Sequence, residues 1–245
     1  MTKFSKQDPL KQASIDISVI VPCVNEVLQI PALLRVLREA GNRFDGSWEL
    51  LVVDGGSTDG TPCLCESHAE VQVIRSKPSR AVQMNLGAKQ ARGKVFYFVH
   101  ADTRPPIDCL NGVWNAVQGG AKIGGYAFEM DSQRPMLAFN SRMTKFNVLA
   151  TRGGDQTIFM TSAFYDQLDG FCESMEIMEE YDLLKKAKEQ GVPYHLLDGQ
   201  TLVSARKYEG RSWFKVQLAN TVAMTLWRLG TDSAKIKRVY ARMLD

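Results

Sequence analysis

Short runs of β-branched and aliphatic residues alternate with helix-like segments through the N-terminal part of the chain. The clearest of these runs are 17–21, 50–53, 71–74 and 95–99. Apolar residues recur at helical spacing after the first run, over 30–40, and after the third run, over 81–91. Uniformly apolar runs are typical of strands buried on both faces, and strands alternating with helices are typical of a parallel sheet with helices on both sides. The sequence therefore predicts an α/β fold.

Polar residues follow three of these predicted strands at the point where each one ends. Asn25 and Glu26 follow the first strand, Asp54 follows the second, and His100 and Asp102 follow the last. The carboxyl ends of parallel strands lie along one edge of a sheet, and ligands bind there. We therefore expect the three polar clusters to converge on one rim.

The second half of the chain is less regular. We predict strands over 124–130 and 157–161 and helices over 135–150 and 179–190. An apolar-rich helix over 213–229 and a basic amphipathic helix over 233–243 follow, and there is no internal repeat. No low-complexity linker divides the chain, so we expect a single domain over residues 16–245 after a flexible tail over 1–15.

Composition excludes several classes of protein. The balance of 30 Lys and Arg against 27 Asp and Glu gives a net charge of +3, which is too small to favour nucleic acid as a partner. The five cysteines form no Cys-x-x-Cys pair, so neither a disulfide framework nor a structural zinc site is indicated. No apolar run is long enough for a signal sequence or a membrane span. We expect a soluble, cytoplasmic protein.

The polar clusters, in their order, resemble those of the family 2 glycosyltransferases. That family has a strand-end Pro-x-x-Asn-Glu, an acidic strand end and a metal-binding Asp-x-Asp. Here the matching segments are 22–26, 52–61 and 100–102. His-Ala-Asp-Thr over 100–103 and Arg-Ala-Val-Gln-Met-Asn over 80–85 resemble a bacterial subgroup that carries His-Ala-Asp-Thr in place of Asp-x-Asp. The resemblance extends from Ile17 to about Tyr240.

The resemblance implies a GT-A fold, with a mostly parallel central sheet flanked by helices and with C-terminal helices. It also implies metal-assisted, inverting transfer of a sugar from a UDP- or GDP-sugar, with Mn²⁺ or Mg²⁺ as cofactor. A nucleotide-binding half would cover about 16–104 and an acceptor and catalytic half about 105–210, with the C-terminal helices over 211–245.

By the same resemblance, the donor nucleotide would contact residues from both ends of the chain. Asp54 would accept a hydrogen bond from a pyrimidine N–H, and the alternative is a carboxylate that caps a turn. Arg80 and the basic stretch 205–211 would pair with phosphates, and the alternative is solvated arginines and lysines. The residues predicted to bind the nucleotide are Pro22, Asn25, Glu26, Asp54, Arg80, Gln83, Asp102, Arg206 and Lys207.

Two residues of the His-Ala-Asp segment are candidate metal ligands. Asp102 offers the oxygen ligand that Mg²⁺ and Mn²⁺ prefer, and the donor diphosphate and water would complete the shell. His100 replaces the first acid of the usual motif. It is either a second ligand or a hydrogen-bonding residue, and both readings stay open.

Three acids are candidates for catalysis. An acceptor hydroxyl needs a base as it attacks the anomeric carbon. The segment 178–183 resembles the family's Glu-Asp pair at a helix start, which makes Glu180 the candidate base, with Glu179 beside it. Acids in the first turn of a helix also complement its dipole, which is the alternative explanation. Asp155, after Gly153 and Gly154, would bind sugar hydroxyls or cap a turn.

The acceptor stays open among a sugar, a lipid and a small molecule, and so does a homodimer. The last two helices either pack on the core or contact the inner face of a membrane beside a lipid-linked acceptor. The alternative functions are a catalytically weakened nucleotide-sugar binding protein and a nucleotidyltransferase. A nucleotidyltransferase would need a Gly-rich loop with a basic residue after the first strand, and it is disfavoured because 22–26 contains no Gly, Lys or Arg. An oxidoreductase is disfavoured because no G-x-G-x-x-G follows an early strand.

Overall fold

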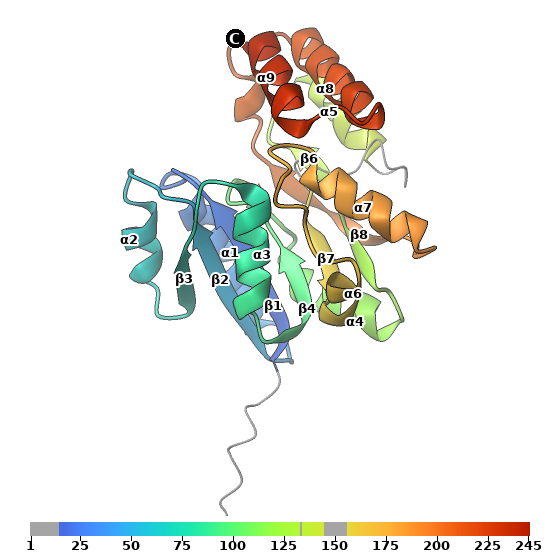
Figure 1. Cartoon of the computed structure of the whole chain (residues 1–245). Helices are drawn as coiled ribbons and strands as arrows, with labels where there is room; N and C mark the ends of the chain where they lie inside the picture. The colour runs from blue at the N-terminus through green and yellow to red at the C-terminus, as the bar shows by residue number, and fades with distance from the viewer. Residues whose placement is uncertain (1–14, 133, 145–155) are drawn as a thin grey trace, which may run out of the picture.

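A mixed sheet of eight strands forms the centre of the computed structural model, which describes residues 15–132, 134–144 and 156–245. The strand order is β3-β2-β1-β4-β7-β6-β8-β5. Helices cover both faces of this sheet, and further helices gather at one end of it (Figure 1). The predicted α/β architecture, a sheet flanked by helices, is thereby confirmed.

The first half is a regular parallel α/β unit. Its strands are β1 (Ile15–Cys23), β2 (Trp48–Asp54), β3 (Val71–Arg75) and β4 (Gly93–Phe98), and its helices are α1 (Ile30–Asn42), α2 (Thr61–Glu66) and α3 (Arg80–Gln90). β1 pairs in parallel with both β2 and β4, and β2 pairs in parallel with β3. The predicted strands and helices of this half are confirmed, each shifted by a residue or two.

The second half mixes strand directions. Its elements are β5 (Thr103–Arg104), α4 (Cys109–Gln118), β6 (Ile123–Met130), α5 (Pro135–Met143), β7 (Ile158–Thr161), α6 (Ser162–Gln167), α7 (Glu179–Glu189), β8 (His195–Val203), α8 (Trp213–Arg228) and α9 (Ser233–Leu244). β7 runs antiparallel to both β4 and β6, whereas β6 and β8 are parallel. The predicted elements of this half are present, but α4, α6, β5 and β8 were given no bounds from the sequence.

Alternate residues of the central strands enter two separate cores. Val19 and Val21 of β1 pack with α1 and α4 on one face of the sheet. Ile20 packs on the other face with residues of α3, α6 and α7. Both faces of β1 are therefore buried, which explains why the strand is apolar from Val19 to Val21. A third cluster, with Val203 and Val216 among its members, packs α8 against β6 and β8.

Some predictions fall outside the described residues. The tail over 1–15 is described only from Ile15, and the helix predicted over 135–150 is described as far as Thr144, with α5 ending at Met143. The division into halves near residue 104 stays a prediction. All five cysteines are free, as expected. Within the described residues, no helix has the length and apolarity needed to cross a bilayer.

Candidate functional site

The loops that follow β1 and β2 are tied to each other at the carboxyl end of the sheet. Asn25 adopts a left-handed backbone conformation, with φ 55°. Its side-chain Oδ1 accepts a hydrogen bond from Thr58 N at 2.8 Å, and its backbone N donates to Ser57 Oγ at 2.8 Å. Glu26 N donates to Thr61 Oγ1 at 2.9 Å. The two predicted polar clusters therefore form one connected surface.

Asp54 sits at the end of β2 opposite Cys23 of β1. Its side chain is only 2% exposed. The carboxylate accepts hydrogen bonds from Gly56 N at 3.1 Å and Ser57 N at 3.2 Å, and Arg75 Nη1 lies 3.3 Å from Oδ2. Asp54 thus holds the turn that follows it, as the capping alternative required.

Two of the predicted nucleotide contacts lie beneath the rim and not on it. Pro22 is buried in β1 opposite Val53. Gln83 is 3% exposed, and its amide Nε2 donates to Cys23 O at 2.9 Å and to Val53 O at 2.7 Å. Both donor hydrogens are used to join β1 and β2, so we assign Gln83 to the scaffold of the site.

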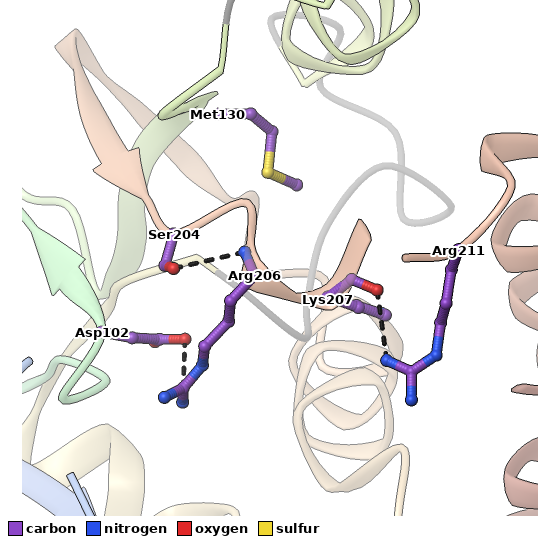
Figure 2. A pocket seen from close by; sticks show the side chains of 6 residues that line it. All are labelled: Asp102, Met130, Ser204, Arg206, Lys207 and Arg211. Carbon is purple, nitrogen blue, oxygen red and sulfur yellow. Dashed lines mark hydrogen bonds and ion pairs between the residues drawn. The ribbon is translucent and has the colours of Figure 1, made fainter. Parts of the chain in front are cut away.

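A pocket of about 380 Å³ opens where the end of β4 meets the segment after β8. Figure 2 shows the side chains that line it, which are Asp102, Met130, Ser204, Arg206, Lys207 and Arg211. Three of the six are cationic, which makes the pocket suitable for an anionic group such as a diphosphate. Asp102, Arg206 and Lys207 were predicted from the sequence, whereas Met130 and Ser204 were not, because neither residue type carries a signal by itself.

Arg206 links the two halves of the chain. Its guanidinium forms a bidentate pair with Glu26, and its Nη2 lies 3.4 Å from Asp102 Oδ2. The hydrogen bond to Glu26 raises the pKa of Arg206 further above its already high value. The cation therefore bridges two carboxylates that the sequence had placed on the same rim.

Lys207 turns toward the C-terminal helices. Its Nζ lies 3.5 Å from Asn220 Oδ1 and 5.5 Å from the centre of the Tyr240 ring. Arg211 Nε donates to Leu244 O at 3.2 Å. Lys207 and Arg211, the basic residues on this side of the pocket, thus contact α8 and α9.

Glu180 is buried beside His100. His100 Nε2 and Glu180 Oε1 are 2.7 Å apart, and the two side chains are 10% and 4% exposed. Burial alone would lower the pKa of His100, but the charge and hydrogen bond of Glu180 outweigh it and raise that pKa. The geometry favours the hydrogen-bonding role for His100 over the role of metal ligand.

Glu179 occupies a different environment on the same helix start. Arg80 Nη1 lies 3.5 Å from its Oε1. Burial, followed by the neighbouring Glu180 charge, raises the pKa of Glu179. Of the two predicted acids, Glu180 therefore contacts His100 and Glu179 contacts Arg80. The third candidate acid, Asp155, lies outside the described residues.

Comparison with known proteins places the chain in a family. The profile of Glycosyl transferase family 2 matches residues 18–165, more than half of the chain. The chain belongs to this family. Among curated relatives, the undecaprenyl-phosphate 4-deoxy-4-formamido-L-arabinose transferase of Pseudomonas paraeruginosa is 31% identical over 124 residues, 47% of this chain. That stretch is only 37% of the relative's own length.

Two solved structures share the fold of this family 2 member. The 1–349 fragment of S. aureus TarS in complex with UDP-GlcNAc has a TM-score of 0.64 at 19% identity, over 94% of this chain and 72% of that fragment. The mannosyltransferase PcManGT of Pyrobaculum calidifontis, in complex with GDP-Man and Mn²⁺, has a TM-score of 0.63 at 20% identity, over 98% of this chain and 72% of PcManGT. At these identities the likeness establishes the GT-A fold.

The pocket of this family 2 domain offers oxygen ligands for a divalent ion, but few of them. The side chain of Asp102 is 26% exposed and lies beside a cation that a metal could replace. Among the described residues, no three His, Cys, Asp or Glu side chains are grouped as a metal site. A divalent ion at Asp102 would therefore take most of its ligands from a bound diphosphate and water, as Mg²⁺ commonly does.

Proposed function

We propose that this protein transfers a sugar from a UDP- or GDP-sugar to an acceptor hydroxyl or phosphate oxygen, with inversion at the anomeric carbon and with Glu180 as the base. One observation carries the proposal. The buried Glu180 carboxylate contacts His100, which is two residues from Asp102 in the anion-suited pocket. A candidate base and a candidate diphosphate site are therefore joined through one short segment.

The donor would bind at the rim between the two halves of the chain. The loops around Asn25 and Asp54, held in place by their own side chains, would frame the nucleoside, and Arg206 and Lys207 would offer cations to the diphosphate. TarS and PcManGT, which share the fold, bind a UDP-sugar and a GDP-sugar respectively. Phosphates would displace Arg206 from its two carboxylates or share it with them.

Asp102 would hold a divalent ion, as the Mn²⁺ complex of PcManGT suggests. Such an ion, when bound, offsets the negative charge of the leaving nucleoside diphosphate. Arg206 and Lys207 supply the same kind of stabilisation from the protein itself. His100 is assigned to Glu180, because its Nε2 is already engaged there. We also propose that the chain belongs to the subgroup with His-Ala-Asp-Thr in place of Asp-x-Asp.

In the proposed reaction, Glu180 accepts the proton of the acceptor hydroxyl as its oxygen bonds to the anomeric carbon. The bond from that carbon to the diphosphate breaks on the opposite face, and the electron pair leaves with the nucleotide. His100 keeps the Glu180 carboxylate in place through the 2.7 Å hydrogen bond. The undecaprenyl-phosphate transferase among the relatives leads us to propose a lipid-phosphate acceptor, whose monoanion carries a P–OH group that Glu180 would deprotonate in the same way.

Replacing Glu180 with Gln tests this proposal. The variant keeps the size of the side chain but removes the base, so turnover of a UDP- or GDP-sugar with Mn²⁺ should fall about 10²–10⁴-fold. Stabilisation by the donor, measured as a thermal shift, should persist. Glu189→Gln, an exposed change at the other end of α7, is the matched control and should leave turnover unchanged.

The outcome also tests one of the alternative functions and the role of Glu180. Donor binding with no turnover in the wild-type protein would identify a nucleotide-sugar binding protein. Wild-type turnover that Glu180→Gln leaves intact would remove Glu180 from the mechanism.

A further inference from the structure

Helix α8 exposes large apolar side chains along one side. Phe214 is 70% exposed, Leu218 is 59% exposed and Leu229, at the end of the helix, is 76% exposed. Leu218 is four residues after Phe214, and Leu229 is eleven residues after Leu218. In a helix with 3.6 residues per turn, these spacings place the three side chains on the same side. The opposite side, with Val216, Ala219 and Ala223, is buried. The exposed residues are therefore not part of the core that holds α8 in place.

The same part of the chain is strongly basic. Residues 211–245 contain seven of the 30 Lys and Arg residues but only two of the 27 Asp and Glu residues. The rest of the chain, with 23 against 25, is slightly acidic by comparison. The seven cations are Arg211, Lys215, Arg228, Lys235, Lys237, Arg238 and Arg242. A charge so concentrated favours an anionic partner.

This surface lies next to the pocket of the site. Arg211 lines the pocket, and Phe214 is three residues further along the chain, at the first turn of α8. In Figure 1, α8 and α9 lie together at the end of the molecule toward which β1 and β4 run. The Trp213 and Phe214 rings pack edge to face at the start of α8, with their centroids 5.0 Å apart.

We infer that α8 and α9 dock on the surface of an anionic lipid bilayer, with Phe214, Leu218 and Leu229 entering the headgroup region. Exposed apolar residues flanked by Lys and Arg are the pattern of helices that lie in a membrane interface. The cations would add attraction to anionic headgroups. The inference extends the proposed function, since a lipid-phosphate acceptor would reach the pocket from this surface, but docking itself requires no turnover.

Vesicle flotation of the full-length protein tests the docking. We expect it to float with vesicles of 30 mol% phosphatidylglycerol in phosphatidylcholine, to bind pure phosphatidylcholine weakly, and to be released by high salt. The double variant Phe214→Ser and Leu218→Ser should lower the bound-to-free ratio about tenfold or more. Leu28→Ser is the matched control, because Leu28 is 87% exposed but lies in the loop before α1.

Several results would overturn the inference. The inference fails if the protein does not float with anionic vesicles, or if it binds both lipid compositions equally. It also fails if Leu28→Ser lowers vesicle binding as much as the double variant does. A dimer in size-exclusion chromatography that the double variant dissociates, without vesicle binding, would assign the surface to a second copy of the chain. Circular dichroism of the double variant should match the wild type, because both residues are exposed.

The docking and the transfer reaction can fail independently. Glu180→Gln should float as the wild type does, since Glu180 is buried away from the exposed side of α8. Flotation without any sugar transfer would leave the docking in place and remove the proposed function. Sugar transfer without flotation would remove the docking and leave the proposed function in place.

Discussion

At the scale of single residues, His100 gains a clear role from its neighbours. In the sequence it stands where the family usually has an acid, and either metal binding or hydrogen bonding fits that position. The structure gives its Nε2 a buried contact with Glu180 at 2.7 Å. A buried carboxylate needs such a partner, because burying an ionised group without one would strongly destabilise the folded protein. His100 thus compensates for burying the candidate base.

The raised pKa of His100 predicts a pH-dependent contribution to stability. His100 therefore binds its imidazole proton more tightly in the folded protein than in the unfolded chain. The contribution is therefore fully present below the ordinary pKa of 6.5 and is lost as the pH rises through the higher pKa of the folded state. The difference in unfolding free energy between the wild type and His100→Gln should therefore shrink over that rise in pH.

Urea denaturation at a series of pH values measures this difference. A difference that grows above pH 6.5 would contradict the raised pKa.

At the scale of elements, α3 acts as a clamp on the two strands that present the nucleotide loops. Gln83 donates to the backbone carbonyls of Cys23 and Val53, which are neighbouring strand ends of β1 and β2. One turn further along, a Cβ on Gly87 would meet Ile20 Cγ2 at 2.5 Å. Only glycine allows the helix to approach the sheet so closely, and this approach lets the Gln83 side chain reach both carbonyls.

Removing the amide of Gln83 should destabilise the fold. Gln83→Ala leaves two buried carbonyl oxygens without this donor, at a cost of about 1–3 kcal/mol. Thermal denaturation should show a lower Tm than for Gln90→Ala, an exposed change in the same helix. Equal Tm values for the two variants would show that the clamp contributes nothing.

At the scale of the whole molecule, Arg206 joins segments that are 180 residues apart in the chain. It follows β8, yet it contacts Glu26 from the loop after β1 and Asp102 from the segment after β4. The pocket therefore depends on how the second half of the chain is placed on the first. A donor diphosphate bound there would contact both halves at once.

Arg206→Ala should weaken donor binding more than it weakens the fold. Loss of one cation that hydrogen-bonds a phosphate costs about 1.5–3 kcal/mol, so the KM for the donor should rise about tenfold or more. Arg38→Ala is the matched control, because Arg38 is also a half-exposed arginine paired with a glutamate, Glu70, but lies away from the pocket.

Steady-state kinetics with the UDP- or GDP-sugar as the varied substrate would measure both variants. An unchanged KM in Arg206→Ala would place the diphosphate elsewhere.

The sequence by itself determined the strands of the first half, its helices α1 and α3, and the rim on which the polar clusters lie. These features follow from local apolar periodicity and from the rule that parallel strands end on one edge. The family also followed from motifs in order along the chain. The sequence did not reveal the antiparallel insertion of β7 between β4 and β6, since strand direction leaves no mark on a short apolar run.

Only the tertiary structure decided which side chains meet. It paired His100 with Glu180 and Arg206 with Glu26, and it buried Gln83 beneath the rim. Each of these contacts joins residues 60 or more positions apart. Such contacts depend on the packing of whole elements against one another, and no local pattern of residues encodes that packing.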